Sequence, residues 1–172
     1  YFMITNINNK KKAFLFNHGK IFLAKQPYKL GDYQNKEIHD THSLKSLEYF
    51  RLFPEDFNKI FGEKATTKIV NEFVALHKYL FKILTHKNTH VYECNPESKN
   101  CFEIFGTDNM ITDTFDVKLL ECNEKIGLST TNLGDAGQLL INEYFTNIME
   151  IAVDPVFPPQ NNIKHKHDYI EL

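Results

Sequence analysis

The sequence predicts an α+β fold in which helices pack on a mostly antiparallel sheet. Short β-branched and aromatic runs, separated by turn residues, fill residues 1–28 and 102–123, whereas residues 66–85 and 135–152 carry apolar side chains at helical spacing. The composition, 42% hydrophobic and 24% charged, is that of a globular protein. At 172 residues the chain is long enough for one domain or for part of a larger one.

The N-terminal segment is expected to form a three-stranded meander. Its strand-like runs are Tyr1 to Thr5, Ala13 to Phe16 and Lys20 to Ala24, separated by the turn sequences "NNK" and "NHG". The three lysines at 10–12 are then expected in a solvated turn. Because residue 1 already lies in a strand-like run, we expect the chain to begin partway through a larger fold.

The middle of the chain is expected to be helical. Residues 29–35 are expected to form a loop, and residues 38–46 show neither helical nor strand periodicity clearly. Short helices are expected over Ser46 to Phe53 and Pro54 to Phe61, followed by a stop at Gly62. A longer amphipathic helix is then expected from a cap at Thr66 or Thr67 to Thr85. Its apolar stripe should cover one face of the sheet.

The second half of the chain is expected to supply a strand pair and another helix. The strands are predicted at Phe102 to Thr112 and Val117 to Asn123, and the helix is predicted from a cap at Asp135 to about Ala152, before a proline-rich segment. Residues 160–172 are polar and are expected to form a C-terminal tail. His165 and His167 could bind a metal there, but a solvated tail is the preferred interpretation.

The charge and the absence of long apolar runs exclude several classes of protein. The net charge of −2 and a pI near 6.5 argue against binding to nucleic acid or to an anionic membrane. No apolar run approaches the roughly 18 to 20 residues that span a bilayer, and no secretory signal is visible. We therefore expect a soluble cytoplasmic protein, with its three cysteines as free thiols and a Cys94–Cys101 bridge disfavoured.

The predicted strand pair contains two acidic residues at unusual positions. If residues 113–116 connect the strands, Thr112 lies opposite Val117, and Asp108 lies directly opposite Glu121. Two opposed carboxylates repel each other, at a cost of about 0.2–1 kcal/mol at an exposed site. A neutralising partner is therefore expected.

A divalent metal is the partner that these residue types favour. Side-chain alternation places Asn123 on the same face as Glu121 and opposite Gly106, where a missing side chain would leave room for phosphates. Two carboxylates and an amide suit Mg²⁺, which fills its remaining positions with water and phosphate oxygens.

Three alternatives to a metal remain open at this point. A lysine could neutralise the pair, although Lys118 is expected on the other face, or the register could slip by one residue. Asp108 and Glu121 could instead act as an acid–base pair for hydrolysis. Cys122 as a nucleophile is disfavoured because its side chain should point away from the acids.

Several segments resemble the tubulin tyrosine ligase family of the ATP-grasp superfamily. The segments "GTDNM" at 106–110 and "LLECN" at 119–123 resemble that family's G-x-D-x-M and E-x-N motif. Further similarity lies in "FNHGKIFLAKQPY" at 16–28, "IHDTHS" at 38–43 and "NIMEIAVDPVFPP" at 147–159. The resemblance implies that residues 1–159 form the C-terminal half of an ATP-grasp domain, followed by the tail.

The resemblance also implies a cofactor site. Asp108, Glu121 and Asn123 would hold Mg²⁺ between the phosphates of ATP, and Met110, Thr41 and Lys25 would contact the nucleotide; no catalytic residue is assigned. The chain departs from the family pattern in three places. Phe22 stands where a basic residue is usual, and Lys25 could substitute for it. His42 replaces an asparagine, and residues 124–127 replace a small-residue and proline turn.

The function that follows is an ATP- and Mg²⁺-dependent ligase. ATP would phosphorylate a carboxylate, and an amine would attack the acyl phosphate, adding an amino acid to a polypeptide acceptor such as tubulin. The departures, together with the missing upstream half, leave a second hypothesis open. In that hypothesis the chain is a non-catalytic structural or interaction module built on the same scaffold.

Overall fold

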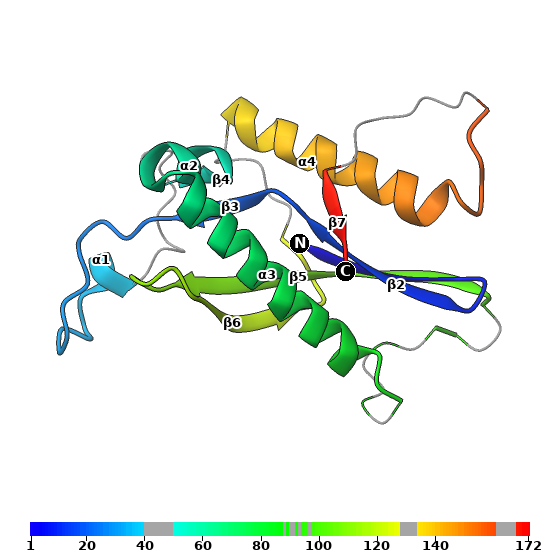
Figure 1. The fold of residues 1–172 in the computed structure, drawn as a ribbon, viewed down its shortest axis with the longest axis horizontal. Helices are drawn as coiled ribbons and strands as arrows, with labels where there is room; N and C mark the ends of the chain where they lie inside the picture. Colours follow the sequence, from blue (N-terminus) through cyan, green and yellow to red (C-terminus); the bar gives the residue numbers. More distant parts are fainter. Residues whose placement is uncertain are drawn as a thin grey trace.

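A computed structural model describes residues 1–39, 50–87, 89, 92, 94–95, 98–127, 134–160 and 168–172. Within these ranges no helix is both long and apolar enough to cross a membrane. The fold is α+β with a mostly antiparallel sheet, as the sequence predicted (Figure 1). Its elements in chain order are β1 (Phe2–Ile7), β2 (Lys10–Phe16), β3 (Gly19–Phe22), α1 (Lys36–His39), β4 (Phe50–Phe53), α2 (Glu55–Phe61), α3 (Glu63–Leu84), β5 (Asn100–Ile111), β6 (Val117–Asn123), α4 (Gly134–Ile148), the π-helical turn η2 (Met149–Val153) and β7 (Tyr169–Glu171).

The main sheet has five strands in the order β6-β5-β1-β2-β7, and every neighbouring pair is antiparallel. The predicted meander is therefore wrong in its third strand, because β3 pairs with β4 in a separate two-stranded sheet. The edge of β2 that β3 would need is taken by β7. Phe16 lies opposite Tyr169, and the backbone N–H of Asn17 donates to the carbonyl of Asp168 at 2.9 Å.

The turn between β1 and β2 depends on two asparagines. Asn8 and Asn9 have φ values of 52° and 63°, and two successive residues with positive φ match the twist of a tight hairpin. Asparagine tolerates this conformation better than most residues because its short side chain bonds locally. Residues 10–12, expected in a turn, are instead exposed positions of β2, and Lys12 Nζ lies 2.7 Å from Glu171 Oε1.

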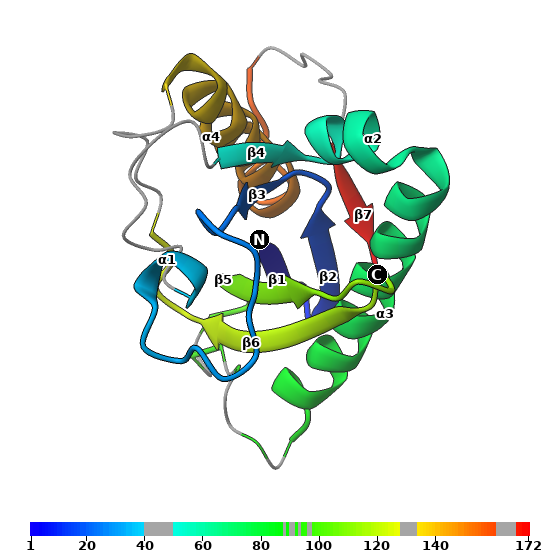
Figure 2. The same ribbon diagram turned by 90° about the vertical axis from the view of Figure 1, so that its left-hand side faces the viewer.

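Strand β1 is buried on both faces, so the molecule has three layers. Phe2 and Ile4 pack with Leu80 of α3, while Met3 packs on the opposite face with Tyr144 of α4. Figure 2 shows α3 and α4 on opposite sides of the strands. The period-two alternation of strand side chains therefore distributes one short apolar run between two helices.

The predicted amphipathic helix is confirmed, although α3 begins earlier than expected. Its first residue is Glu63, directly after Gly62, whose φ of 82° ends α2. Thr66 is consequently not the cap, and its hydroxyl donates to the Gly62 carbonyl at 3.0 Å. Ile69 and Leu80 of the predicted stripe are buried, as is His77, which the stripe did not include.

Two other predictions of local structure need correction. The helix expected over 46–53 is wrong for residues 50–53, which form β4 because Phe50 and Phe53 are buried against neighbouring aromatic rings. Near the end of the chain, Tyr169–Glu171 form the edge strand β7, which the polar character of that segment had not indicated.

The expectation of three free thiols is also wrong. Cys94 and Cys101 form a disulfide, with their Cα atoms 5.9 Å apart, an ordinary separation for such a bond. Cys122 is the one free cysteine of the three and is half-buried, and burial raises the pKa of its thiol. The cysteine count therefore gives no support for a reducing compartment.

Burial of His77 predicts a pH-dependent stability. Its Nδ1 donates to the Phe73 carbonyl at 2.7 Å, its Nε2 lies 3.0 Å from the Thr107 hydroxyl, and burial lowers its pKa from 6.5 to about 4. Below pH 6.5 the unfolded chain takes up a proton that the folded chain refuses until about pH 4. The free energy of unfolding should therefore decrease as the pH is lowered from 6.5 to about 4, by at most about 1.4 kcal/mol per pH unit.

Urea unfolding measured at several pH values between 7 and 4.5 checks this expectation. His77→Gln should lower stability at every pH and also flatten the dependence on pH, because the group that titrates is gone. His39→Gln, at an exposed position, serves as the matched control and should keep the slope of the unchanged protein. Equal slopes for the unchanged protein and His77→Gln would contradict the assignment.

Candidate metal and nucleotide site

The tip of the β5–β6 hairpin is held rigidly against α2 and α3. Phe115, at a φ of 60°, places its ring 6.0 Å from Phe57 and 5.5 Å from Phe61 between centroids. Lys68 of α3 bonds Asp116 at 2.8 Å and the carbonyl of Thr114 at 2.6 Å. The hairpin therefore presents a fixed outer face to solvent.

The predicted opposition of the two acids is present in the structure. Asp108 pairs with Glu121, and Gly106 pairs with Asn123. Nearer the turn, however, Ile111 rather than Thr112 lies opposite Val117, so that prediction is wrong by one residue. The register changes between Asp108 and Asn109, where Leu120 is the extra residue of a β-bulge.

The bulge also moves Lys118 to an unexpected face. Lys118 pairs with Met110, which shares the face of Asp108, whereas the sequence had placed this lysine on the opposite face. Hydrogen bonding to Lys68 lowers the pKa of Asp116, and Lys118 adds a smaller Coulombic contribution. One positive charge therefore stands on the acidic side of the hairpin, toward its tip.

Asp108, Glu121 and Asn123 form what we call the acidic patch. The first two are exposed and the third is half-buried. The amide of Asn123 donates to Glu121 Oε1 at 2.8 Å, so these two side chains converge. This bond leaves the carbonyl oxygen of Asn123 and the second oxygen of Glu121 as acceptors beside Asp108. Hard oxygen donors of this kind suit a magnesium ion.

The space expected at Gly106 is filled by protein. A Cβ built on Gly106 would lie 2.9 Å from Cγ2 of Ile126 and 4.0 Å from the ring of Tyr1. The expectation that this glycine leaves room for phosphates is therefore wrong. Its missing side chain instead allows residue 126, in the segment after β6, to pack across β5.

Tyr1 lies near Asp108 of the acidic patch and Lys20 lies beside Tyr1, and neither residue was identified from the sequence. Burial, with a contribution from the charge of Asp108, raises the pKa of the Tyr1 phenol. Lys20 Nζ lies 6.0 Å from the centre of the Tyr1 ring, and burial lowers the pKa of this lysine. The register of β3 against β4 brings Lys20 to this place, and local sequence patterns do not specify that pairing.

The three expected nucleotide contacts have different positions. Met110 is 56% exposed and lies two residues from Asp108 on the same face of β5. Lys25 contacts Glu37, with 4.0 Å between the charged atoms and a 3.0 Å hydrogen bond from its backbone N–H to the Glu37 carbonyl. Thr41 lies outside the described residues, as does His42.

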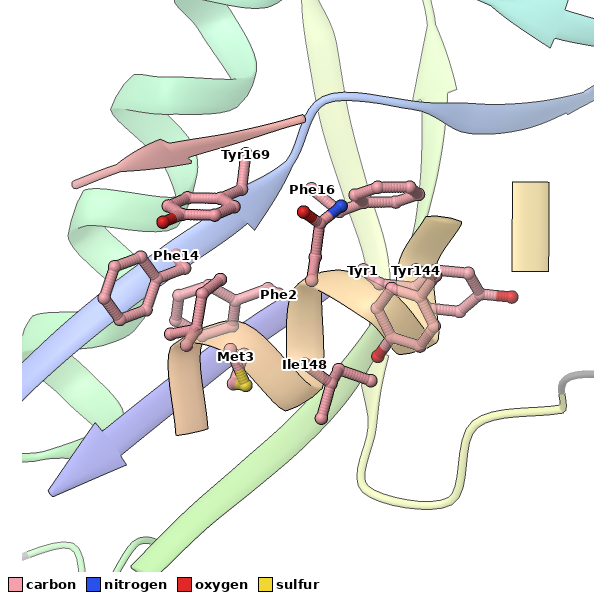
Figure 3. A pocket seen from close by; sticks show the side chains of 10 residues that line it. Tyr1, Phe2, Met3, Phe14, Phe16, Tyr144, Ile148 and Tyr169 are labelled. Atoms are coloured by element: carbon pink, nitrogen blue, oxygen red, sulfur yellow. The ribbon is translucent and has the colours of Figure 1, made fainter. Parts of the chain in front are cut away.

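A small cavity lies between α4 and the sheet (Figure 3). It measures about 20 Å³, room for roughly one water molecule. Tyr1 and Tyr144 lie side by side at one end of it, 4.6 Å apart between ring centroids. The remaining lining is apolar except for Asn147, so the cavity is a gap in core packing: Phe2, Met3, Phe14, Phe16, Ile148, Ile151 and Tyr169.

The tubulin-tyrosine ligase family matches residues 1–161. The chain belongs to this family. The match covers most of the chain, including the acidic patch, both principal helices and the small sheet of β3 and β4. The resemblance inferred from "GTDNM" and "LLECN" is thereby confirmed at the level of the family.

The close contact at Gly106 predicts the effect of a substitution in this tubulin-tyrosine ligase family member. Gly106→Ala should lower the free energy of unfolding by about 1–3 kcal/mol, because the new methyl group overlaps Ile126. Combining Gly106→Ala with Ile126→Ala should relieve the overlap, because the γ-methyl group of residue 126 is removed. Ile126→Val keeps a γ-methyl group at that position and should not relieve it. A double-mutant cycle from chemical denaturation measures this coupling.

Proposed function

We propose that this protein is an ATP- and Mg²⁺-dependent carboxylate–amine ligase that adds an amino acid to a polypeptide acceptor such as tubulin. In this proposal the chain supplies the C-terminal part of an ATP-grasp fold. Membership of the tubulin-tyrosine ligase family supports the reaction class. The observation that carries the proposal is the pairing of Asp108 with Glu121, beside an asparagine that bonds to Glu121.

The acidic patch fits a magnesium ion on chemical grounds. Its carboxylates face each other across two strands, where a bound divalent cation would remove their repulsion. Magnesium keeps several water and phosphate ligands, so an open face with few protein ligands is suitable. Asp108, Glu121 and Asn123 would hold the ion, which would neutralise negative charge on the transferring phosphoryl group.

The proposed reaction has two steps. A carboxylate oxygen attacks the γ-phosphorus of ATP and displaces ADP, and an amine nitrogen then attacks the acyl carbon, displacing phosphate and losing a proton. Neither step requires a covalent bond to the protein. The part of this chain is therefore to position the phosphates and to balance their charge, which is the main source of rate enhancement in phosphoryl transfer.

Lys20 is the cation that we propose for the phosphates on this side of the site. Phe22 stands where the family usually has a basic residue, and Lys20 shares its face because the two positions are two residues apart on β3. Lys20 also lies over the ring of Tyr1, and the pKa of the Tyr1 phenol is raised by burial and by the charge of Asp108. A lysine two positions earlier could thus replace the usual basic side chain.

A non-catalytic module remains the second candidate, and one observation favours it. Ile126 covers Gly106 beside the acidic patch, in the place where the sequence had suggested room for phosphates. A scaffold that no longer binds nucleotide would tolerate this packing. The two candidates differ in a measurable property, which is nucleotide binding by the full-length protein.

Substitutions in the acidic patch test the proposal. In the full-length protein, Asp108→Asn and Glu121→Gln should each weaken binding of Mg-ATP by about tenfold or more, because each removes a charged metal ligand without changing shape. Asp113→Asn, at an exposed acid in the turn of the same hairpin, is the matched control and should bind normally. Isothermal titration calorimetry gives the affinities. Absence of Mg-ATP binding by the folded, unchanged protein would favour the non-catalytic module.

Lys20 has its own test. Lys20→Gln should weaken Mg-ATP binding by about tenfold, or roughly 1.4 kcal/mol, whereas Lys59→Gln on the exposed surface of α2 should have no effect. Lys20→Arg should restore part of the affinity because it restores the charge. If Lys20→Gln binds Mg-ATP as well as the unchanged protein, this lysine does not contact the phosphates.

A further inference from the structure

A second group of metal-ligating side chains lies on a different part of the molecule. One ligand atom each of His18, Glu143 and Asp168 falls within 4.8 Å of the other two. The three residues come from separate segments: the connection between β2 and β3, helix α4, and the residue before β7. Chain segments more than 120 positions apart in sequence therefore converge on one point, which is distinct from the acidic patch.

The imidazole of His18 is oriented by a fourth residue. Its Nδ1 lies 2.9 Å from Glu55 Oε1, at the start of α2, and its Nε2 lies 3.9 Å from Asp168 Oδ1. A histidine that donates its Nδ1–H to a carboxylate keeps the Nε2 lone pair available for a metal. Metal-bound histidines are commonly held by such an outer carboxylate, which also increases their basicity.

The fold fixes the positions of these groups. The ring of His18 is mostly buried and packs 5.5 Å from the ring of Phe16. Asp168 is held by its carbonyl, which accepts the backbone N–H of Asn17, and by the β2–β7 pairing that follows. Glu143 lies at an exposed position of α4, where its side chain has room to change rotamer.

The charge of this group calls for a cation. Glu55, Glu143 and Asp168 place three carboxylates around one imidazole. Glu55 and Asp168 each lie within 4.0 Å of His18. Among the described residues, no lysine or arginine forms an ion pair with Glu143 within that distance. Carboxylates that lie this close together repel one another, and a divalent ion would neutralise the charge of two of them.

We propose that His18, Glu143 and Asp168 bind a divalent transition-metal ion of the Zn²⁺ class, with Glu55 as the outer carboxylate. One imidazole nitrogen and two carboxylate oxygens suit zinc, whereas magnesium and calcium prefer oxygen ligands alone. Zinc bonds of about 2.0–2.2 Å at tetrahedral angles place ligand atoms about 3.3–3.6 Å apart. The three ligand atoms lie within 4.8 Å of one another, so the widest separation must shorten by up to about 1.5 Å. Rotation of Glu143 provides this movement.

The ion would act as a structural clip. It would join β7 to the β2–β3 connection and to α4, and through His18 and Glu55 it would also restrain α2. A metal that binds the folded chain and not the unfolded chain stabilises it in proportion to the excess over Kd. At free Zn²⁺ about 100-fold above Kd, we expect the melting temperature to rise by roughly 5–10 °C.

The experiment uses the full-length protein after treatment with a chelator, with no nucleotide present. Zn²⁺ is titrated by calorimetry in excess Mg²⁺, and the melting temperature is measured at each addition. One Zn²⁺ per chain is expected at the His18 group. His18→Gln, Glu143→Gln and Asp168→Asn should each weaken binding by about 100-fold, and Glu55→Gln by about tenfold, as for other outer carboxylates.

Matched controls separate this group from other ligands. Asp135→Asn on α4, His39→Gln on α1 and Asp108→Asn in the acidic patch should leave Zn²⁺ affinity unchanged, as should the double replacement of His165 and His167 by glutamine. Unchanged affinity in His18→Gln and Asp168→Asn, or its loss in the double histidine variant, would overturn the proposal. So would the absence of any binding up to millimolar Zn²⁺.

A measurement on the unchanged protein covers the case in which a variant fails to fold. X-ray absorption of the Zn²⁺-loaded protein should give a shell of one imidazole nitrogen with oxygen ligands. A shell with sulfur, or with two or more imidazoles, would place the ion at Cys122 or at another set of histidines and would exclude this site. Neither readout depends on ligase activity, so the outcome is independent of the proposed function.

Discussion

The burial of β1 on both faces is the constraint from which the rest of the arrangement follows. Phe2 and Ile4 need the apolar stripe of α3, and Met3 needs that of α4, so the strand must lie between the two helices. Its pairing with β5 sets Phe2 opposite Phe105. Side chains of β5 then alternate in a fixed way, and the even-numbered positions from Ile104 onward face the side of α4.

The acidic patch is a consequence of that alternation. Along one face of β5, Ile104 packs at the edge of the core beneath α4, Gly106 is covered by Ile126, and Asp108 reaches solvent. One face of β5 thus changes within five residues from apolar core, through a close backbone contact, to a polar surface. The magnesium site that we propose therefore borders the core, and Tyr1 lies next to it, with Lys20 on the other side of the Tyr1 ring.

Short sequence patterns predicted those helices and strands whose positions depend on interactions between residues near one another in the sequence. Helices α3 and α4 and the arms of the acidic hairpin were predicted correctly because helical spacing and strand propensity are properties of short segments. Ile83 and Leu139, which were expected in the buried stripes, are exposed. The pairing of Asp108 with Glu121 was correct partly because two deviations cancel. The turn is one residue longer on the β5 side than expected, and the bulge at Leu120 restores the register. Lys118, which lies between the turn and the bulge, was consequently assigned to the wrong face.

Other features could not be predicted because they depend on distant partners. Nothing near β3 indicates that it pairs with β4, and the polar end of the chain gives no sign of β7. His77 is a different case, since it stands four residues after Phe73 and three before Leu80, which places it on the buried stripe of α3. Its helical spacing from these two residues could have predicted its burial, but histidine is polar and was therefore not counted in the apolar stripe.

The late position of β7 in the sequence has a consequence for synthesis on the ribosome. Strand β2 is synthesised about 150 residues before β7, so its outer edge is not paired until Tyr169–Glu171 have left the exit tunnel. Until then, a row of backbone donors and acceptors is open to pairing with other nascent chains. The exposed lysines at the start of β2 carry positive charge along that edge, which discourages such pairing during the interval.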